Sequence, residues 1–222
     1  PESLKVVRER AIDRPKYRGV LHAYCFFLSI PVGVTLIITS PSPRTSFAAA
    51  AFAFGISSML GISALFHRTK FSDHDWMRFR RLDHIGIYLC IAGGYTPIGM
   101  LAVSGWVQKT LLITAWAGVA IGAIIRFLPF DPPYGLMNAL FLSMGWVAIV
   151  AIPQLSDFLD LTWLILLAIG GALYTTGAFV VGLRRPDPWP DIFGYHEIWH
   201  LMVVLAASLH YCVRAFGVIP NA

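Results

Sequence analysis

The sequence contains seven long stretches without a single Asp, Glu, Lys or Arg. They cover residues 19–43, 45–67, 84–108, 110–125, 132–156, 161–183 and 198–213. A helix needs about 20 consecutive apolar residues to cross the hydrocarbon core of a bilayer, with a range of about 17–25. Five stretches reach that length directly. The fourth and the seventh reach it with their flanking residues, Phe127–Phe130 and Ile192–His196.

The apolar character of these stretches is continuous and does not alternate, which favours helices over the strands of a membrane barrel. Hydrophobic residues make up 57% of the chain and charged residues only 13%, against roughly 25% charged residues in soluble domains. So few charges cannot cover a surface that faces water. The sequence therefore excludes a soluble, a disordered or a disulfide-stapled chain, and it predicts an all-α membrane protein, a bundle of seven transmembrane helices.

The orientation of the bundle follows from its basic residues. With seven spans, the N-terminal tail and the second, fourth and sixth loops share one side, and 14 of the 17 Lys and Arg residues fall there. The other side has only Arg44, Lys109 and Arg214. Because basic loops remain in the cytoplasm, we expect the N-terminus to be cytoplasmic and the C-terminus outside, in the plasma (inner) membrane of the cell.

Three segments are expected along the chain: a basic cytoplasmic tail (1–18), the seven-helix domain (19–216) and a short external tail (217–222). The tail lacks the apolar core and cleavage site of a signal peptide. The net charge of +5 is explained by basic residues at anionic headgroups, so the expected partners are membrane lipids and not nucleic acid. The three cysteines lie within spans without CxxC spacing and are expected to be buried free thiols: Cys25, Cys90 and Cys212.

Two local features refine this picture. The longest cytoplasmic connection, about residues 68–82, is predicted to be a short amphipathic segment at the membrane interface. The Gly93-Gly94 and Gly170-Gly171 pairs are typical of places where two helices cross closely.

Ionisable residues within membrane helices are costly and therefore mark candidate functional sites. His196 and His200 are four residues apart, so they share one helix face with Cβ atoms about 6 Å apart. Ser63 and His67 have the same spacing at the cytoplasmic end of the second helix, and Asp83 opens the third helix from that side. The predicted topology thus places all five residues at one depth. Three imidazoles with one open position are typical of a catalytic zinc site.

Other roles for these residues stay open at this point. A histidine near a helix end can bind a backbone carbonyl, Asp83 can cap the third helix, and Ser63 can bond within its own helix. The remaining histidines are weaker candidates: His22, His74, His84 and His210.

At these motifs the chain resembles the progestin and adipoQ receptor family, and its bacterial hemolysin III branch in particular. The matching residues are Ser63-x3-His67, Asp83, and His196-x3-His200. The resemblance implies a zinc ion held by the three histidines, Asp83 near the zinc-bound water and Ser63 supporting it. A more distant similarity to alkaline ceramidases implies hydrolysis of a lipid amide. A hormone-receptor role is not expected, because the 18 residues before the first span are too few for the N-terminal cytoplasmic domain of the receptors.

The same residues also bear on other classes of protein. His196–His200 also matches HExxH, the zinc-protease motif in which the Glu is the base, but no acidic residue follows Glu197 to act as a third ligand. The role of Glu197 stays open. A retinal protein needs a Lys in its last helix, and no Lys follows Lys109. A G-protein-coupled receptor has its N-terminus outside, contrary to the orientation expected from the basic residues. A membrane haem needs axial histidines on opposite sides of its ring, whereas His196 and His200 share one helix face. Both classes are therefore set aside.

We therefore expect zinc held by His67, His196 and His200, with Asp83 as general base, to hydrolyse a ceramide-like amide or ester near the cytoplasmic face. Ser63 would orient Asp83 or a histidine, or stabilise the oxyanion. Two alternatives remain: a non-enzymatic sensor of membrane lipids with a structural zinc site, and an oligomeric pore. Asp83 could also be a fourth ligand. The sequence leaves the lipid and the oligomeric state undetermined.

Overall fold

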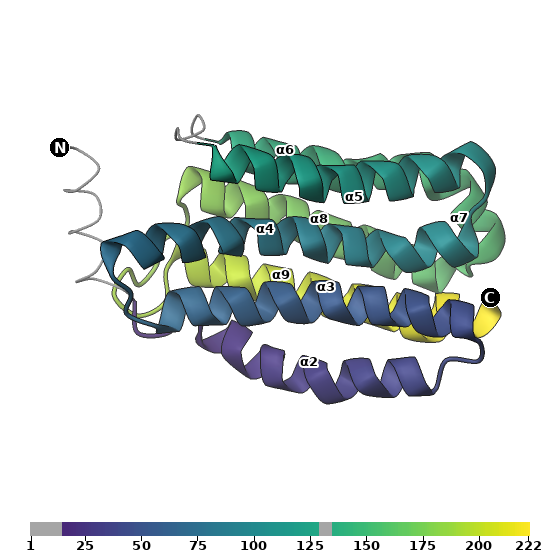
Figure 1. Cartoon of the computed structure of the whole chain (residues 1–222), viewed down its shortest axis with the longest axis horizontal. Helices are drawn as coiled ribbons and strands as arrows, with labels where there is room; N and C mark the ends of the chain where they lie inside the picture. The colour runs from purple at the N-terminus through teal and green to yellow at the C-terminus, as the bar shows by residue number, and fades with distance from the viewer. Residues whose placement is uncertain (1–14, 129–134) are drawn as a thin grey trace.

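The computed structural model describes residues 15–128 and 135–222, and these ranges contain seven helical spans long and apolar enough to cross a membrane. The spans are Val20–Ile38, Pro43–Arg68, His74–Ala102, Gly105–Phe127, Leu136–Phe158, Leu161–Leu183 and Tyr195–Asn221. They lie side by side along the long axis of the molecule (Figure 1). The predicted all-α bundle of seven membrane-spanning helices is confirmed. Most of the predicted basic tail, residues 1–14, lies outside the described residues.

Four spans are single helices: α2 (Val20–Ile38), α3 (Pro43–Arg68), α5 (Gly105–Phe127) and α8 (Leu161–Leu183). The other three are composite. The third span joins α4 (Asp73–Pro97) to the π-helical turn η1 (Ile98–Ala102). The fifth consists of α6 (Leu136–Trp146), η2 (Val147–Ala151) and α7 (Ile152–Phe158), and the last of α9 (Tyr195–Cys212), η3 (Val213–Val218) and η4 (Ile219–Asn221).

The outer surface of the bundle carries large apolar side chains. Phe27, Ile38 and Leu161 are each more than two-thirds exposed, at 72%, 74% and 71%. In water such a surface would be unstable, since each Å² of exposed apolar area costs about 25 cal/mol. The same surface is favourable against lipid tails. Together with the length of the helices, this makes the chain a multi-pass membrane protein.

The third span begins about ten residues earlier than its charge-free stretch predicts. Ser72 is the N-cap of α4, and its hydroxyl accepts a hydrogen bond from the backbone N–H of Asp75. The expectation that Asp83 opens this helix is therefore wrong, and Asp83 is not its cap. Charged residues mark where the hydrocarbon core ends, but the backbone hydrogen bonds of a helix continue beyond that boundary into the headgroup layer.

Glycines allow two pairs of helices to approach closely, as predicted. A Cβ atom on Gly93 would lie 2.6 Å from the backbone oxygen of Ala51, and one on Gly55 would lie 2.6 Å from the backbone oxygen of Leu89. This double approach joins α3 and α4. Between α8 and α9, a Cβ on Gly170 would lie 2.5 Å from the ring of His210. Side chains at these positions would separate the helices.

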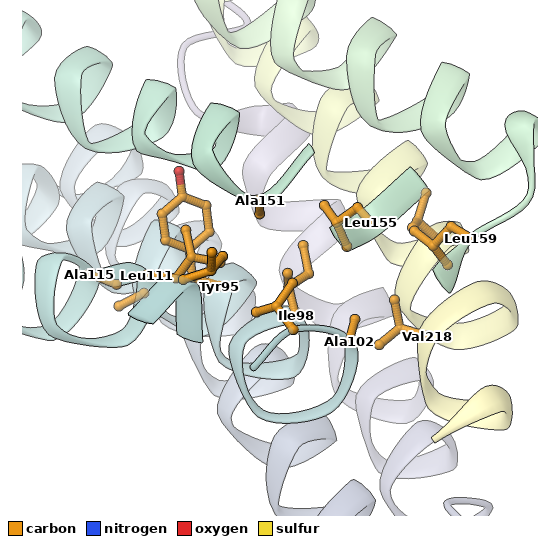
Figure 2. Close-up of a cluster of buried hydrophobic side chains, with 13 residues drawn as sticks. Tyr95, Ile98, Ala102, Leu111, Ala115, Ala151, Leu155, Leu159 and Val218 are labelled. Atoms are coloured by element: carbon orange, nitrogen blue, oxygen red, sulfur yellow. The ribbon is translucent and has the colours of Figure 1, made fainter. Parts of the chain in front are cut away.

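The bundle has two ends with different contents, the histidine end and the far end. The histidine end is the end where α3 stops and α4 and α9 start. The opposite end, called the far end, is filled by a buried apolar cluster that includes Tyr95, Ile98, Leu111, Leu155 and Val218 (Figure 2). A second apolar cluster includes Trp199 and Val203, the neighbours of His200 on α9, so apolar packing lies directly beneath the histidine end.

Candidate metal centre

Three histidines from two helices meet at the histidine end. His67 lies in the last turn of α3, and His196 and His200 lie in the first two turns of α9. One ring nitrogen from each falls within 4.8 Å of the others. The ring centroids are 4.8 Å apart for His67 and His196, 5.1 Å for His67 and His200, and 4.7 Å for His196 and His200. His67 and His200 are buried and His196 is half-buried.

This donor set fits a zinc ion. Nitrogens bound to one tetrahedral zinc at about 2.0–2.1 Å lie roughly 3.3 Å from each other, so small side-chain rotations would close the present arrangement around an ion. Neutral imidazoles are ligands that zinc binds well, although other divalent ions bind them too. Among residues 15–128 and 135–222, one group of at least three His, Cys, Asp or Glu side chains lies close enough to hold a metal ion, and it consists of these three histidines.

Asp83 lies beside this cluster. It occupies the third turn of α4, and its Oδ2 is 4.0 Å from Nε2 of His67. That separation is too long for a hydrogen bond but short enough for both groups to contact one small molecule. Ser63, one turn before His67 on α3, is buried, and its hydroxyl lies close to the Asp83 carboxyl. The five residues selected from the sequence are thus brought together in one place.

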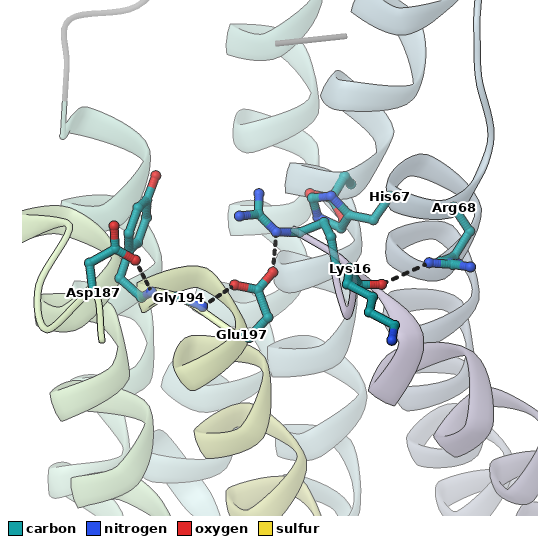
Figure 3. A network of polar contacts seen from close by, with 9 residues as sticks. Lys16, His67, Arg68, Asp187, Gly194 and Glu197 are labelled. Carbon is teal, nitrogen blue, oxygen red and sulfur yellow. Dashed lines mark hydrogen bonds and ion pairs between the residues drawn. The ribbon is translucent and has the colours of Figure 1, made fainter. Parts of the chain in front are cut away.

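Glu197 has a structural role that the sequence left open. Its Oε2 accepts a hydrogen bond of 2.8 Å from the backbone N–H of Gly194, which caps the start of α9. Its Oε1 forms an ion pair and hydrogen bond with Nε of Arg18 (Figure 3). Adjacent residues on a helix point about 100° apart, so Glu197 projects from a different side of α9 than His196. Both carboxylate oxygens are already engaged, which argues against the protease interpretation of HExxH.

Residues 15–19, here called the N-terminal strap, lie across the histidine end. The backbone N–H of Lys16 donates to the carbonyl of Asp191 at 3.0 Å, and the Lys16 carbonyl accepts from Arg68 at 3.5 Å (Figure 3). Gly19 ends the strap with a φ of +75°, and a Cβ there would lie 2.5 Å from the Cβ of His67. Only glycine satisfies both the backbone conformation and this contact.

His22, predicted to be a weaker candidate, lies against the histidine cluster. It lies in the first turn of α2, is 2% exposed, and stacks on His200 with ring centroids 3.8 Å apart and planes 14° from parallel. The depth argument that selected the other residues applies equally to His22, because the first helix enters from the same side. By contrast, His74 is exposed beside Asp75, and His210 is paired with the carbonyl of Leu167.

The cysteines take no part in the site. Cys25, Cys90 and Cys212 are free thiols, as expected, but each is half-buried, so the expectation that they are buried is wrong.

A bundle of seven membrane-length helices with a buried histidine cluster at one end defines this chain as a multi-pass membrane protein with a candidate metal centre. The model of the haemolysin-III related family matches residues 10–211, and the chain belongs to that family. This range includes every residue of the candidate site.

Curated relatives agree with this assignment. Hemolysin-3 of Bacillus cereus is 34% identical over 208 residues, which cover 92% of this chain and 91% of the relative. The Hemolysin-3 homolog of Bacillus subtilis (strain 168) is 32% identical over 207 residues, 90% of this chain and 92% of the relative. The adiponectin receptor protein of Drosophila melanogaster is 31% identical over 72% of this chain, a match that covers 40% of the receptor. The resemblance identified from the motifs is confirmed.

Proposed function

We propose that this protein is a zinc-dependent hydrolase that cleaves a ceramide-like amide or ester of a membrane lipid. The observation that carries the proposal is the convergence of three imidazole nitrogens within 4.8 Å, with a carboxylate 4.0 Å from one of them. A purely structural zinc site has no need of an extra carboxylate. The basic residues near this end of the bundle favour placing it at the cytoplasmic face of the plasma (inner) membrane.

The residues divide the chemistry among them. His67, His196 and His200 would hold the ion. A zinc ion bound there supplies a Lewis acid that polarises a carbonyl and lowers the pKa of water towards about 7. Asp83 lies where it can take a proton from the attacking water, and general-base catalysis of this kind contributes about 10²–10⁴-fold in rate. Ser63 lies close enough to the Asp83 carboxyl to orient it.

The substrate class follows from the position of the site. The histidines lie at the end of membrane-spanning helices, above an apolar cluster that includes Trp199 and Val203. An acyl chain would lie along the bundle, with its scissile carbonyl at the level of the histidines. The strap covers this end from outside the bundle, so a lipid would approach sideways from the bilayer.

The first experiment is metal analysis of detergent-purified protein beside a His67→Ala, His200→Ala double variant. We expect one zinc per parent chain and none in the double variant. Purified parent protein should then release fatty acid from ceramides or other acyl lipids, and chelation should stop the reaction. Absence of metal in the parent after zinc loading would contradict the proposal.

A second candidate is a lipid sensor with a structural zinc site. The observation in its favour is that the histidines connect α3 to α9, two helices that are far apart in sequence. In that case chelation would lower the unfolding temperature strongly, and no lipid product would form with any substrate. The names of the two Bacillus relatives also suggest haemolysis, which would show as dye release from protein-treated liposomes.

A further inference from the structure

His22 is a buried polar residue whose nitrogens are not satisfied by the protein. Neither Nδ1 nor Nε2 has a hydrogen-bond partner among the described residues, and both atoms are inaccessible to solvent. The His200 backbone is close to the ring, but the geometry falls short of a hydrogen bond. Buried polar atoms in native proteins are almost always paired, so an unpaired one needs an explanation.

Packing explains the ring of His22 but not its nitrogens. The ring stacks face to face on His200 and fills space between α2 and α9. A phenylalanine ring would make the same stack without burying unpaired polar atoms. The nitrogens therefore point to something that the protein binds at this place.

The stacked geometry argues against His22 as a fourth ligand of the same ion. An imidazole binds a metal in the plane of its ring, along the nitrogen lone pair. The planes of His22 and His200 are nearly parallel at 14°, with centroids 3.8 Å apart. An ion in the plane of His200 therefore lies well outside the plane of His22. The nitrogens of His22 reach instead to a molecule that lies beside the ion.

His22 and Asp83 lie on opposite sides of the histidine cluster. His22 is on α2, which packs against α3 and α9, whereas Asp83 is on α4, which packs against the other side of α3 (Figure 1). A molecule bound at the cluster would thus have a carboxylate on one side and an imidazole on the other. A carboxylate accepts protons, and a neutral imidazole has an N–H to donate.

We propose that His22 donates a hydrogen bond to the carbonyl oxygen of the acyl substrate bound at the metal centre. This inference rests on the proposed metal site and adds the residue that recognises the carbonyl. A donor fixed by stacking would stabilise the negative charge that develops on that oxygen during attack. The required ligand is therefore an acyl compound with an accessible carbonyl, of the amide or ester class.

The test uses acetohydroxamate, a small acyl compound that binds divalent metals, and the full-length protein loaded with Co²⁺. Binding is followed by the visible absorption of the cobalt. His22→Phe keeps the stacked ring and removes both nitrogens. We expect this variant to retain one cobalt per chain and to bind acetohydroxamate about tenfold more weakly, the effect of losing one good hydrogen bond.

Two further variants separate the nitrogens from the ring. His22→Gln loses the stack but keeps a side-chain N–H donor, and it should recover most of the lost affinity. His210→Phe is the matched control, since His210 is a histidine of the same bundle about 15 Å further along α9 with its own carbonyl partner. It should leave both cobalt content and acetohydroxamate affinity unchanged.

The outcomes distinguish this inference from the proposed function. Unchanged acetohydroxamate affinity in His22→Phe with full cobalt content would overturn the role of His22 and leave the metal site intact. Loss of cobalt from His22→Phe would also overturn it, because His22 would then hold the metal itself. A parent chain that binds no metal would overturn the proposed function first. If His22→Phe fails to fold, His22→Leu gives the same comparison.

Discussion

Arg214 at the far end and His22 at the histidine end are equally buried polar side chains, but their hydrogen bonding differs. At the far end, Arg214 is 2% exposed, and its three nitrogens donate to backbone carbonyls, two to Gly94 and one to His210, at 2.9–3.2 Å. At the histidine end, His22 is equally buried but its nitrogens have no partner among the described residues.

The difference teaches how to separate structural from functional polar residues in a membrane protein. A polar group whose hydrogen bonds close within the protein stabilises the fold. A polar group held rigidly with its bonds left open is suited to a ligand. On this criterion Arg214 and Glu197 are structural, and His22 belongs to the candidate site.

The largest effect is expected for Asp83→Asn. The amide cannot take a proton, so turnover of the lipid substrate should fall by about 10²–10⁴-fold. Zinc content should stay at one per chain, because the three histidines are untouched. Turnover is measured by fatty-acid release and zinc by mass spectrometry. If activity survives, Asp83 is not the base; if zinc is lost, Asp83 is a ligand.

Gly19→Ala, a change in the N-terminal strap, should displace His67 and so weaken the metal site at the histidine end. A Cβ at φ +75° is strained, and here it would also meet His67 at 2.5 Å. We expect a loss of about 3 kcal/mol in the free energy of unfolding and about tenfold weaker metal binding. The matched control is Gly105→Ala, which has φ +62° at the far end with no atom within 4 Å. It should lose about 1 kcal/mol. Equal metal affinities in the two variants would show that the strap does not position His67.

Arg214→Lys tests whether the buried arginine at the far end contributes to stability without affecting the metal site. The change keeps the charge, but an ammonium group has a single nitrogen and does not reproduce the planar guanidinium, whose three nitrogens donate to carbonyls on two helices. The expected loss is about 2 kcal/mol in the free energy of unfolding, measured in detergent, with unchanged zinc content. A variant that unfolds normally but loses zinc would show that the two ends are coupled.

Glu197→Gln is expected to have the smallest effect. The amide oxygen can still cap Gly194, but the ion pair with Arg18 is lost, which should lower the free energy of unfolding by about 1 kcal/mol. Turnover should stay within about threefold of the parent. A fall of 100-fold or more would instead restore the HExxH interpretation, in which this carboxylate is the base.

Much of the fold and the site could be predicted from the sequence. Seven charge-free stretches of membrane length determine seven helical spans, because every backbone N–H and C=O group within the bilayer core must be hydrogen-bonded inside the protein, and a helix achieves this within one segment. The four-residue spacing of His196 and His200 determines that they share a face, because a helix repeats every 3.6 residues. The start of α4 was also visible in Ser72-x-x-Asp75, a capping pattern that the count of charges overlooked.

Other features were decided only by tertiary structure. Glu197 follows His196 directly, and its neighbours in the sequence do not show whether it is a catalytic carboxylate or a helix cap. Its role is decided by the ion pair with Arg18, which lies 179 residues away in the chain. His22 becomes part of the site only because α2 packs against α9 and brings its ring onto His200. Spacing within one helix is set by backbone geometry, whereas contacts between helices depend on how their side chains pack together, which no local pattern encodes.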